Sequence, residues 1–393
     1  MNLNEFQAKR LLARYGIAAP MGHVAQSAAE AEDVARRLGC ARYVVKAQIP
    51  ITNRLDQNAI AFANSPQQVG QQAGRLLGMR IAAGAGVRAM PVTRVYIEEM
   101  IERPREYYVA VTLDRASGQV MMLGSREGGQ AIESRAASDP GVIHRAFLRL
   151  ETNRLRADFE GFARQVDAGE TAATALAEVY RNLASAFLAF DATQIEINPL
   201  AISPAGHVLA LDAKIAVDDN AMFRRPELAA MRDDTAASGH DPAELEAQRF
   251  QINYLALDGT IGVAVNGAGL ALATHDLIVE AGGRPANFMD IRTTASSLDI
   301  ANGFNILLAH PQTRAVLVNV HGGGMQRCDT IAEGLGIALR RTSRRPPIVI
   351  RMAGNNADFA RTVLANNGVA YSASDDMDDA ARRAVMLSAK EAA

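Results

Sequence analysis

The sequence predicts an α/β protein of two domains, the second of which contains a doubly wound parallel sheet. After residue 249, five short apolar strands each precede a helical pattern: IGVAVNG, ANFMDI, AVLVNV, PIVIRM and VAYSA. Such alternation favours parallel strands joined by right-handed crossovers. Before residue 235, strands and helices occur in mixed order with hairpin signals. That order predicts an α+β region with mixed sheets.

The elements of the first half follow from local signals. A first helix, NEFQAKRLLARYG, ends at Gly16, and a second begins at the N-cap Ser27 and ends at Gly39. The strand VVKAQI follows, then a helix over about 65–79 and the strands TRVYIEEM and EYYVAVTLDR. ASGQ predicts a hairpin turn into VMMLGS, and residues 140–190 predict helix. TQIEINPLAIS and HVLALDAKIAV predict a second hairpin.

The domain boundaries follow from length and a shift in composition. A chain of 393 residues is too long for one ordinary core. The stretch RDDTAASGHDPAELEAQR is polar and contains glycine and proline, which is typical of a linker. We therefore expect a first domain over 1–235, a linker over 236–248 and a second domain over 249–393.

Composition excludes several classes of function. The net charge of -2 gives no general attraction to nucleic acid or to anionic membranes. No apolar run approaches the ~20 residues that a membrane span needs, and the charged, amphipathic N-terminus does not resemble a signal peptide. The two cysteines, Cys40 and Cys328, indicate a reducing compartment and no thiolate zinc site. We expect a cytoplasmic protein that binds neither nucleic acid nor membrane.

The carboxyl ends of the predicted parallel strands carry a candidate anion site. Ligands bind at this edge in open parallel sheets. There the turn HGGGMQRCD places Gly322, Gly323 and Gly324 before a helix, where backbone N–H groups and the helix dipole favour an anion. The alternative is a turn that needs glycine for geometry alone. His321 is the histidine best placed for chemistry there, and its alternative is likewise a turn residue.

A second candidate site lies in the predicted hairpin of EINPL and LALDAK. Strand alternation places Glu196 and Asn198 on one face, and the hairpin partner brings Asp212 beside them. Carboxylate and amide oxygens suit Mg²⁺ accompanied by nucleotide phosphates. The alternative is an acidic row that faces solvent.

Several motifs, in order and spacing, resemble the β subunits of succinyl-CoA synthetase and malate–CoA ligase. They are NLNEFQAKRLLARYGIAAP, EINPL, LDAK, DDNAMFRRPELAAMRD, NYLALDGTIGVAVNGAGLA, RCD and GNNA, and they run nearly end to end. The resemblance implies an ATP-grasp domain followed by a flavodoxin-like CoA-ligase domain. It also implies a partner, an α subunit that carries CoA and the histidine that ATP or GTP phosphorylates. The phosphoryl group then passes to a carboxylic acid, and CoA displaces it. No histidine of this chain matches the phosphorylated one, so no catalytic residue is expected here.

The resemblance also implies roles for individual residues. The nucleotide-binding positions match Lys46, Arg54, Glu98, Ile101 and Glu106. The Mg²⁺ positions match Asn198 and Asp212. Near the acid substrate and the phosphohistidine, Asn266, Gly322 and Gly323 match family positions, and Arg292, His321 and Gly324 are the further candidate substrate-binding residues beside them.

Three departures from the family pattern leave the function partly open. Residues 50–61, PITNRLDQNAIA, replace a basic glycine-rich loop and contain no glycine. MDIRTTASS places Arg292 where the family has a glycine triplet, and the turn at His321 is about one residue longer. Arginine grips carboxylates with two hydrogen bonds, which favours an acid more polar than succinate, malate-like or larger.

The alternatives are a non-catalytic paralogue that regulates an α-type subunit, or use of another phosphoryl donor. The sequence leaves ATP versus GTP, and heterodimer versus heterotetramer, undecided.

Overall fold

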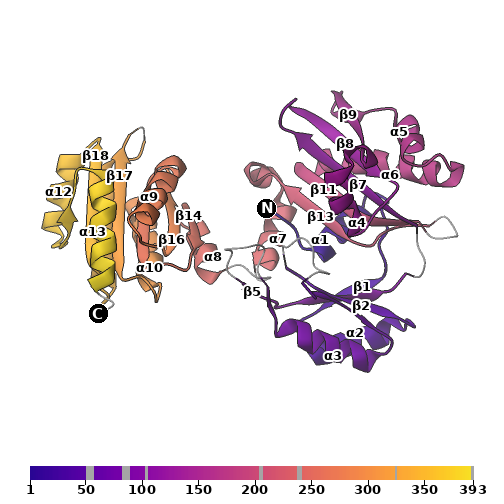
Figure 1. Cartoon of the computed structure of the whole chain (residues 1–393), viewed down its shortest axis with the longest axis horizontal. Coiled ribbons are helices and arrows are strands. Elements are labelled where there is room, and N and C mark those ends of the chain that lie inside the picture. Colours follow the sequence, from indigo (N-terminus) through magenta and orange to yellow (C-terminus); the bar gives the residue numbers. More distant parts are fainter. Residues whose placement is uncertain are drawn as a thin grey trace. The chain divides into compact units, whose positions relative to one another are not determined.

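The computed structural model describes residues 1–49, 57–81, 89–101, 105–202, 207–236, 241–323 and 325–390. The chain divides into two compact units, with the boundary between residues 239 and 240. They are called unit 1 and unit 2 (Figure 1). Within the described ranges, no helix combines the length and the apolar character needed to cross a membrane.

Unit 1 contains a small antiparallel sheet in the order β1-β6-β2-β3. Its strands are β1 (Gly22–Ala25), β6 (Val95–Glu99), β2 (Tyr43–Ala47) and β3 (Ile60–Ala63). Helices α2 (Ala28–Leu38) and α3 (Pro66–Leu77) cover one face of it (Figure 1). The predicted caps of α2 are confirmed, because Ser27 accepts a hydrogen bond from the backbone N–H of Glu30 and Gly39 is left-handed.

The larger sheet of unit 1 has the order β10-β9-β8-β7-β11-β12, with β13 also paired to β11. Its strands are β7 (Arg105–Asp114), β8 (Gln119–Ser125), β9 (His144–Glu151), β10 (Arg154–Arg156), β11 (Ala192–Ile202), β12 (Val208–Ala210) and β13 (Ala213–Val217). Both predicted hairpins are confirmed, since β7 pairs antiparallel with β8, and β11 with β12 and β13.

Helices pack against this larger sheet and share its apolar core. Its apolar core includes side chains from α5 (Phe159–Val166), α6 (Glu170–Ala189) and the N-terminal helix α1 (Glu5–Ala13). The remaining elements of unit 1 are α4 (Ala131–Ser138), η1 (Pro140–Val142), η2 (Asp219–Arg224), α7 (Pro226–Ala236) and a two-stranded pair, β4 (Arg80–Ile81) with β5 (Met90–Pro91).

The predicted continuous helix over 140–190 is wrong at its start. Residues 144–156 form the antiparallel pair β9–β10, and the helices α5 and α6 follow it. The two turn residues, Thr152 and Asn153, have φ of 50° and 59°. A pair of left-handed residues closes a tight hairpin, and β8 supplies hydrogen bonds to the other edge of β9. These long-range bonds outweigh the local helical preference of the segment.

Unit 2 is the predicted doubly wound sheet, with the strand order β14-β16-β15-β17-β18-β19. The five predicted strands are confirmed as β15 (Ile261–Val265), β16 (Asn287–Ile291), β17 (Ala315–Gly322), β18 (Ile348–Gly354) and β19 (Ser372–Ala373). They run parallel to one another. A sixth strand, β14 (Ile252–Ala256), pairs antiparallel with β16 at the edge.

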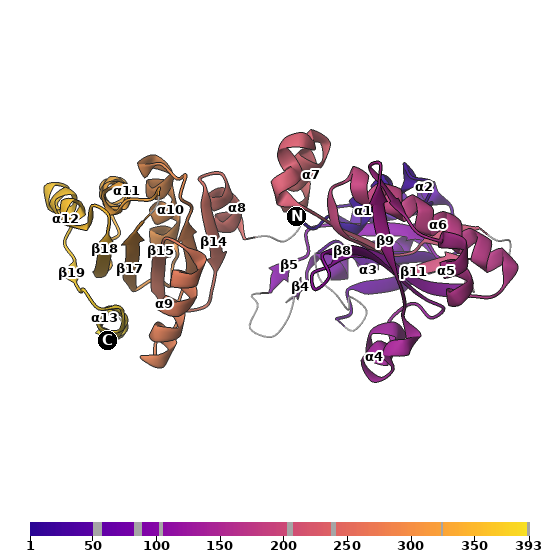
Figure 2. The same cartoon turned by 90° about the horizontal axis from the view of Figure 1, so that it is seen from above.

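Helices cover both faces of this sheet. Helices α9 (Ala268–Glu280) and α13 (Met377–Lys390) lie on one face, and α10 (Ser297–Ala309), α11 (Cys328–Arg341) and α12 (Ala357–Asn366) lie on the other (Figure 2). The segment expected to be a linker includes helix α8 (Pro242–Gln248), whose Ala247 is buried in the apolar core of unit 2.

Candidate functional site

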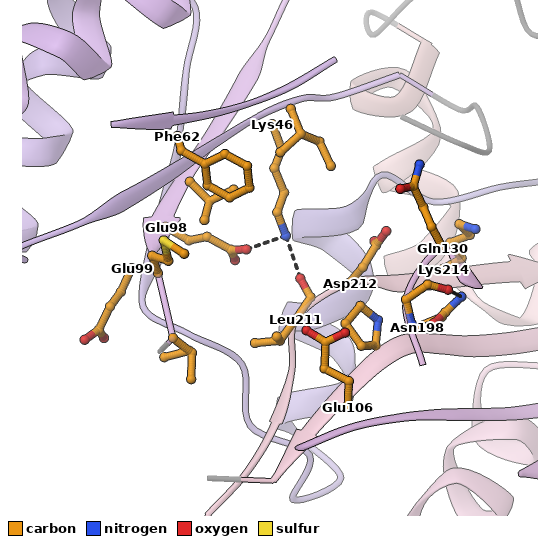
Figure 3. Close-up of a pocket in the computed structure, with 16 residues that line it drawn as sticks. Lys46, Phe62, Glu98, Glu99, Glu106, Gln130, Asn198, Leu211, Asp212 and Lys214 are labelled. Atoms are coloured by element: carbon orange, nitrogen blue, oxygen red, sulfur yellow. Dashed lines mark hydrogen bonds and ion pairs between the residues drawn. The ribbon is translucent and has the colours of Figure 1, made fainter. Parts of the chain in front are cut away.

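A cavity of about 310 Å³ opens in unit 1 between the small sheet and the β11–β13 hairpin (Figure 3). Six of the residues predicted for nucleotide or metal binding line it: Lys46, Glu98, Ile101, Glu106, Asn198 and Asp212. The other lining residues are Val44, Ile60, Phe62, Glu99, Met100, Gly129, Gln130, Pro199, Leu211 and Lys214. The fold therefore brings together residues that are far apart in the sequence. Arg54 lies outside the described residues.

Lys46 and Glu98 lie at the inner end of this cavity, on the adjacent strands β2 and β6. Their side chains form an ion pair, and Lys46 Nζ also donates to the carbonyl oxygen of Leu211 at 2.6 Å (Figure 3). Both side chains are at most 7% exposed. A buried charge of either sign requires compensation from nearby groups. Lys46 and Glu98 each supply part of the compensation for the other.

Helix α1 supplies two further charges that the sequence analysis missed. Glu5 Oε1 lies 2.9 Å from Lys46 Nζ, and Lys9 Nζ lies 2.5 Å from Glu98 Oε2. Glu5 and Lys9 also pair with each other across one helical turn at 2.8 Å. We call these four side chains, Glu5, Lys9, Lys46 and Glu98, the buried charge network. In the sequence, the signal that could have identified Glu5 and Lys9 was their spacing. They lie about two turns and one turn before Leu12, on the apolar face of the first helix.

The predicted metal residues are neighbours across the hairpin. The backbone N–H of Asn198 donates to the carbonyl oxygen of Asp212 at 3.2 Å. The side-chain oxygen of Asn198 accepts from the N–H of Gly129 at 2.6 Å and retains a second lone pair. Glu196, predicted on the same strand face, pairs instead with Lys214 at 3.1 Å.

These residues offer an incomplete set of metal ligands. In the described part of the chain, no three His, Cys, Asp or Glu side chains gather in a way that could hold a metal ion. One carboxylate and one amide oxygen fit Mg²⁺ only where phosphate oxygens and water complete the octahedron.

The outer part of the cavity combines an apolar wall with a perturbed carboxyl group. Ile60, Phe62, Met100 and Ile101 form much of the wall, which suits a flat, weakly polar ring. Burial raises the pKa of Glu106 above the ordinary value of 4.5. Glu106 thus remains protonated to a higher pH than an exposed glutamate does.

In unit 2, the predicted residues near the acid substrate gather at the carboxyl ends of β15, β16 and β17. Asn266 follows β15, and its amide pairs with both backbone groups of His321, accepting at 2.9 Å and donating at 2.7 Å. A Cβ atom added to Gly322 would lie 2.4 Å from the carbonyl oxygen of Asn355. Gly322 is therefore required for this close approach of two backbone segments.

The neighbouring glycine turn uses its own hydrogen bonds. The N–H of Gly323 donates to the carbonyl oxygen of Gln326 at 3.1 Å. Gly324 lies outside the described residues.

Arg292 extends from the end of β16 and is exposed. Its Nε and Nη2 both donate to the side-chain oxygen of Asn253, at 3.0 and 2.8 Å. Asn253 in turn donates to Asp290 at 3.1 Å. The guanidinium group is thus oriented through an amide, and its full positive charge remains available to an anion.

Comparisons with known proteins match this chain over both units. Residues 2–202 match the model of the ATP-grasp domain, and residues 264–385 match that of the CoA-ligase domain. The chain is 39% identical, over 99% of its length and 100% of the relative's, to the succinate–CoA ligase [ADP-forming] subunit beta of Burkholderia ambifaria. It is 40% identical, over 98% of both chains, to the protein of the same description from Anaeromyxobacter dehalogenans.

Among solved structures, the ATP citrate lyase of Methanothrix soehngenii, in complex with citrate and coenzyme A, has a similar fold. It has a TM-score of 0.77 at 16% identity and covers 99% of each chain.

Proposed function

Because the chain belongs to the family of succinate–CoA ligase β subunits, we propose that it is the β subunit of an NDP-forming acid–CoA ligase. The observation that carries this proposal is the cavity of unit 1, which joins Lys46, Glu98, Glu106, Asn198 and Asp212 in one pocket. That pocket lies in the region matched by the ATP-grasp model.

In this proposal a nucleoside triphosphate occupies the cavity of unit 1. The apolar wall receives the base, Glu106 accepts hydrogen bonds from the ribose, and Lys46 contacts the phosphates. Asn198 and Asp212 would hold Mg²⁺, which neutralises phosphate charge when it is bound. Arg54 is the further proposed phosphate contact. ATP and GTP both fit this description.

The chemical steps require a partner, an α subunit that carries CoA and a histidine. The γ-phosphoryl group moves to a nitrogen of that histidine, releasing NDP, and then to a carboxylate oxygen of the acid. The CoA thiolate attacks the resulting acyl phosphate, forming the thioester and releasing inorganic phosphate. This chain would position and desolvate the nucleotide and the acid, while the nucleophile belongs to the partner.

The acid would bind at the strand ends of unit 2, beside Arg292, His321 and Asn266. Arg292 is a fixed positive charge with planar donors, and such a group favours carboxylates over neutral molecules. We therefore propose a di- or tricarboxylic acid more polar than succinate as the substrate.

The test uses this chain co-purified with its α partner. The complex is incubated with Mg²⁺, γ-labelled ATP or GTP, CoA and a panel of di- and tricarboxylic acids. We expect label on the partner's histidine, and then acyl-CoA formation that depends on one acid. A stable complex that accepts no label from either nucleotide would overturn the proposal and favour a regulatory paralogue.

A further inference from the structure

The buried charge network reaches the cavity through Lys46 and Glu98, which line it, and is electrically balanced. It contains two ammonium groups and two carboxylates, all at most 7% exposed. Each lysine contacts both glutamates, and each donates to the carbonyl oxygen of Leu211, at 2.7 Å from Lys9 and 2.6 Å from Lys46. The network therefore has a near-symmetric arrangement around one carbonyl group.

The three donors of the Lys46 ammonium group already have partners inside the protein. An ammonium group offers three N–H donors, and Lys46 contacts Glu5, Glu98 and Leu211. A phosphate oxygen can therefore be bound by Lys46 only if one of these contacts is exchanged. The ease of that exchange depends on what remains beside the two carboxylates.

Lys9 is positioned to remain beside the carboxylates of Glu5 and Glu98 when Lys46 exchanges a contact. It contacts both carboxylates, at 2.8 Å for Glu5 and 2.5 Å for Glu98, but it does not line the cavity. Its ammonium group also lies 5.3 Å from the centre of the Tyr96 ring, a cation–π contact. Burial and the neighbouring Glu98 raise the pKa of Tyr96, so its ring stays neutral.

We propose that Lys9 and Glu5 are positioning residues that control the release of Lys46 from the buried charge network to the nucleotide phosphates. This inference rests on the proposed function of the cavity. Lys9 compensates the carboxylates while Lys46 turns toward the phosphate, and Glu5 sets how strongly Lys46 is retained. Nucleotide affinity should then follow the net charge of the network.

Charge-changing variants separate this role from a merely structural one. Lys9→Met leaves the network with a net negative charge, which holds Lys46 more strongly and repels the phosphates. Glu5→Gln leaves a net positive charge and loosens Lys46. The double variant restores neutrality. Arg10→Met is the matched control, because it removes a positive charge from an exposed position on the same helix.

The dissociation constant of Mg²⁺–ATP or Mg²⁺–GTP is measured by calorimetry for each variant, assembled with the α partner. We expect Lys9→Met to weaken binding about tenfold or more, and Glu5→Gln to tighten it severalfold. The double variant and Arg10→Met should both lie within about threefold of the wild type. Histidine phosphorylation in a single turnover should follow the same order.

Opposite or flat results overturn the inference. If both single variants weaken binding and the double variant is weaker still, the network is only structural. If the Lys9→Met variant fails to assemble with the α partner, the nucleotide affinity of Glu5→Gln still tests the inference. A purely structural role predicts no gain in that affinity. A wild-type complex that binds nucleotide, with variants that do not differ, overturns this inference alone. A wild-type complex that binds none overturns the proposed function as well.

Discussion

The two candidate regions of this chain differ in how their charged side chains are stabilised. In unit 1, the charges of Lys46 and Glu98 are buried and compensated by two further side chains from α1. In unit 2, Arg292 is exposed at a strand end and is oriented by an amide rather than a carboxylate. A buried charge must be compensated by protein groups even when no ligand is bound, whereas an exposed charge is solvated by water.

This difference predicts where substitutions affect folding and where they affect binding alone. In unit 1 the two effects should be coupled, since a nucleotide bound by Lys46 as proposed would compete with contacts that stabilise the fold. In unit 2, removal of the Arg292 charge should affect binding without changing the free energy of unfolding. Only substitutions that disturb close backbone packing should destabilise this unit.

The largest effect is expected for Lys46→Met in unit 1. It removes the proposed phosphate contact and leaves Glu5 and Glu98 with a single ammonium group. Histidine phosphorylation should fall about 10²-fold or more, as on loss of a charge-stabilising group. The free energy of unfolding should fall by about 3 kcal/mol, since one partner of a buried pair is missing. Single-turnover labelling and urea unfolding measure the two quantities. Phosphorylation within about threefold of the wild type would contradict the assigned role.

Gly322→Ala should be the most destabilising small change in unit 2. The added Cβ would meet the carbonyl oxygen of Asn355 at 2.4 Å, which forces two strand ends apart. We expect a loss of about 1–3 kcal/mol in urea unfolding. Gly323→Ala is the matched control, because its nearest contact would be the His321 ring at 3.7 Å. Equal losses for the two variants would show that steric contact at Gly322 is not the cause.

Arg292→Ala should affect binding of the acid without affecting folding. Loss of a hydrogen bond to a charged group weakens binding by about 1.5–3 kcal/mol, or roughly 10–100-fold in KM for the acid. The KM for the nucleotide should stay within about twofold. Arg292→Lys keeps the charge but not the planar donors, so its KM for the acid should lie between those of the wild type and Arg292→Ala. Steady-state kinetics measure both constants, and equal shifts in both would remove Arg292 from the acid site.

The smallest effect concerns the pH dependence of Glu106. Burial raises its pKa above 4.5, so the carboxylate is lost at a higher pH than in the unfolded chain. Ionisation therefore costs folding free energy above the folded-state pKa, and this cost is absent below the unfolded-state pKa. If ionised Glu106 accepts the ribose hydroxyls, wild-type nucleotide affinity should fall as the pH decreases toward that raised pKa.

In Glu106→Gln this acidic limb should disappear, with affinity about threefold lower than wild type near neutral pH. Calorimetric titration between about pH 5 and pH 7.5 compares the two proteins. Identical profiles would show that Glu106 does not contact the nucleotide in its ionised form.

Elements with local sequence signals could be predicted before the fold was known. The five parallel strands of unit 2 were predicted because short apolar runs, glycine turns and helical periodicity follow one another there. The hairpin of β11 with β12 and β13 was likewise predictable, and with it the contact between Asn198 and Asp212. Strand alternation depends only on neighbouring residues, so it can be read without the fold.

Elements and contacts that depend on residues far apart in the chain could be established only from the folded structure. The arginine- and leucine-rich stretch 144–156 has a local preference for helix, but pairing of β9 with β8 makes it a hairpin. In the same way, Glu5 and Lys9 are recognisable as a helical pair in the sequence, and their contacts with Lys46 and Glu98 are not. Burial removes water from all four groups at once, so their arrangement is set by mutual compensation of charge. Only the folded chain brings those charges together.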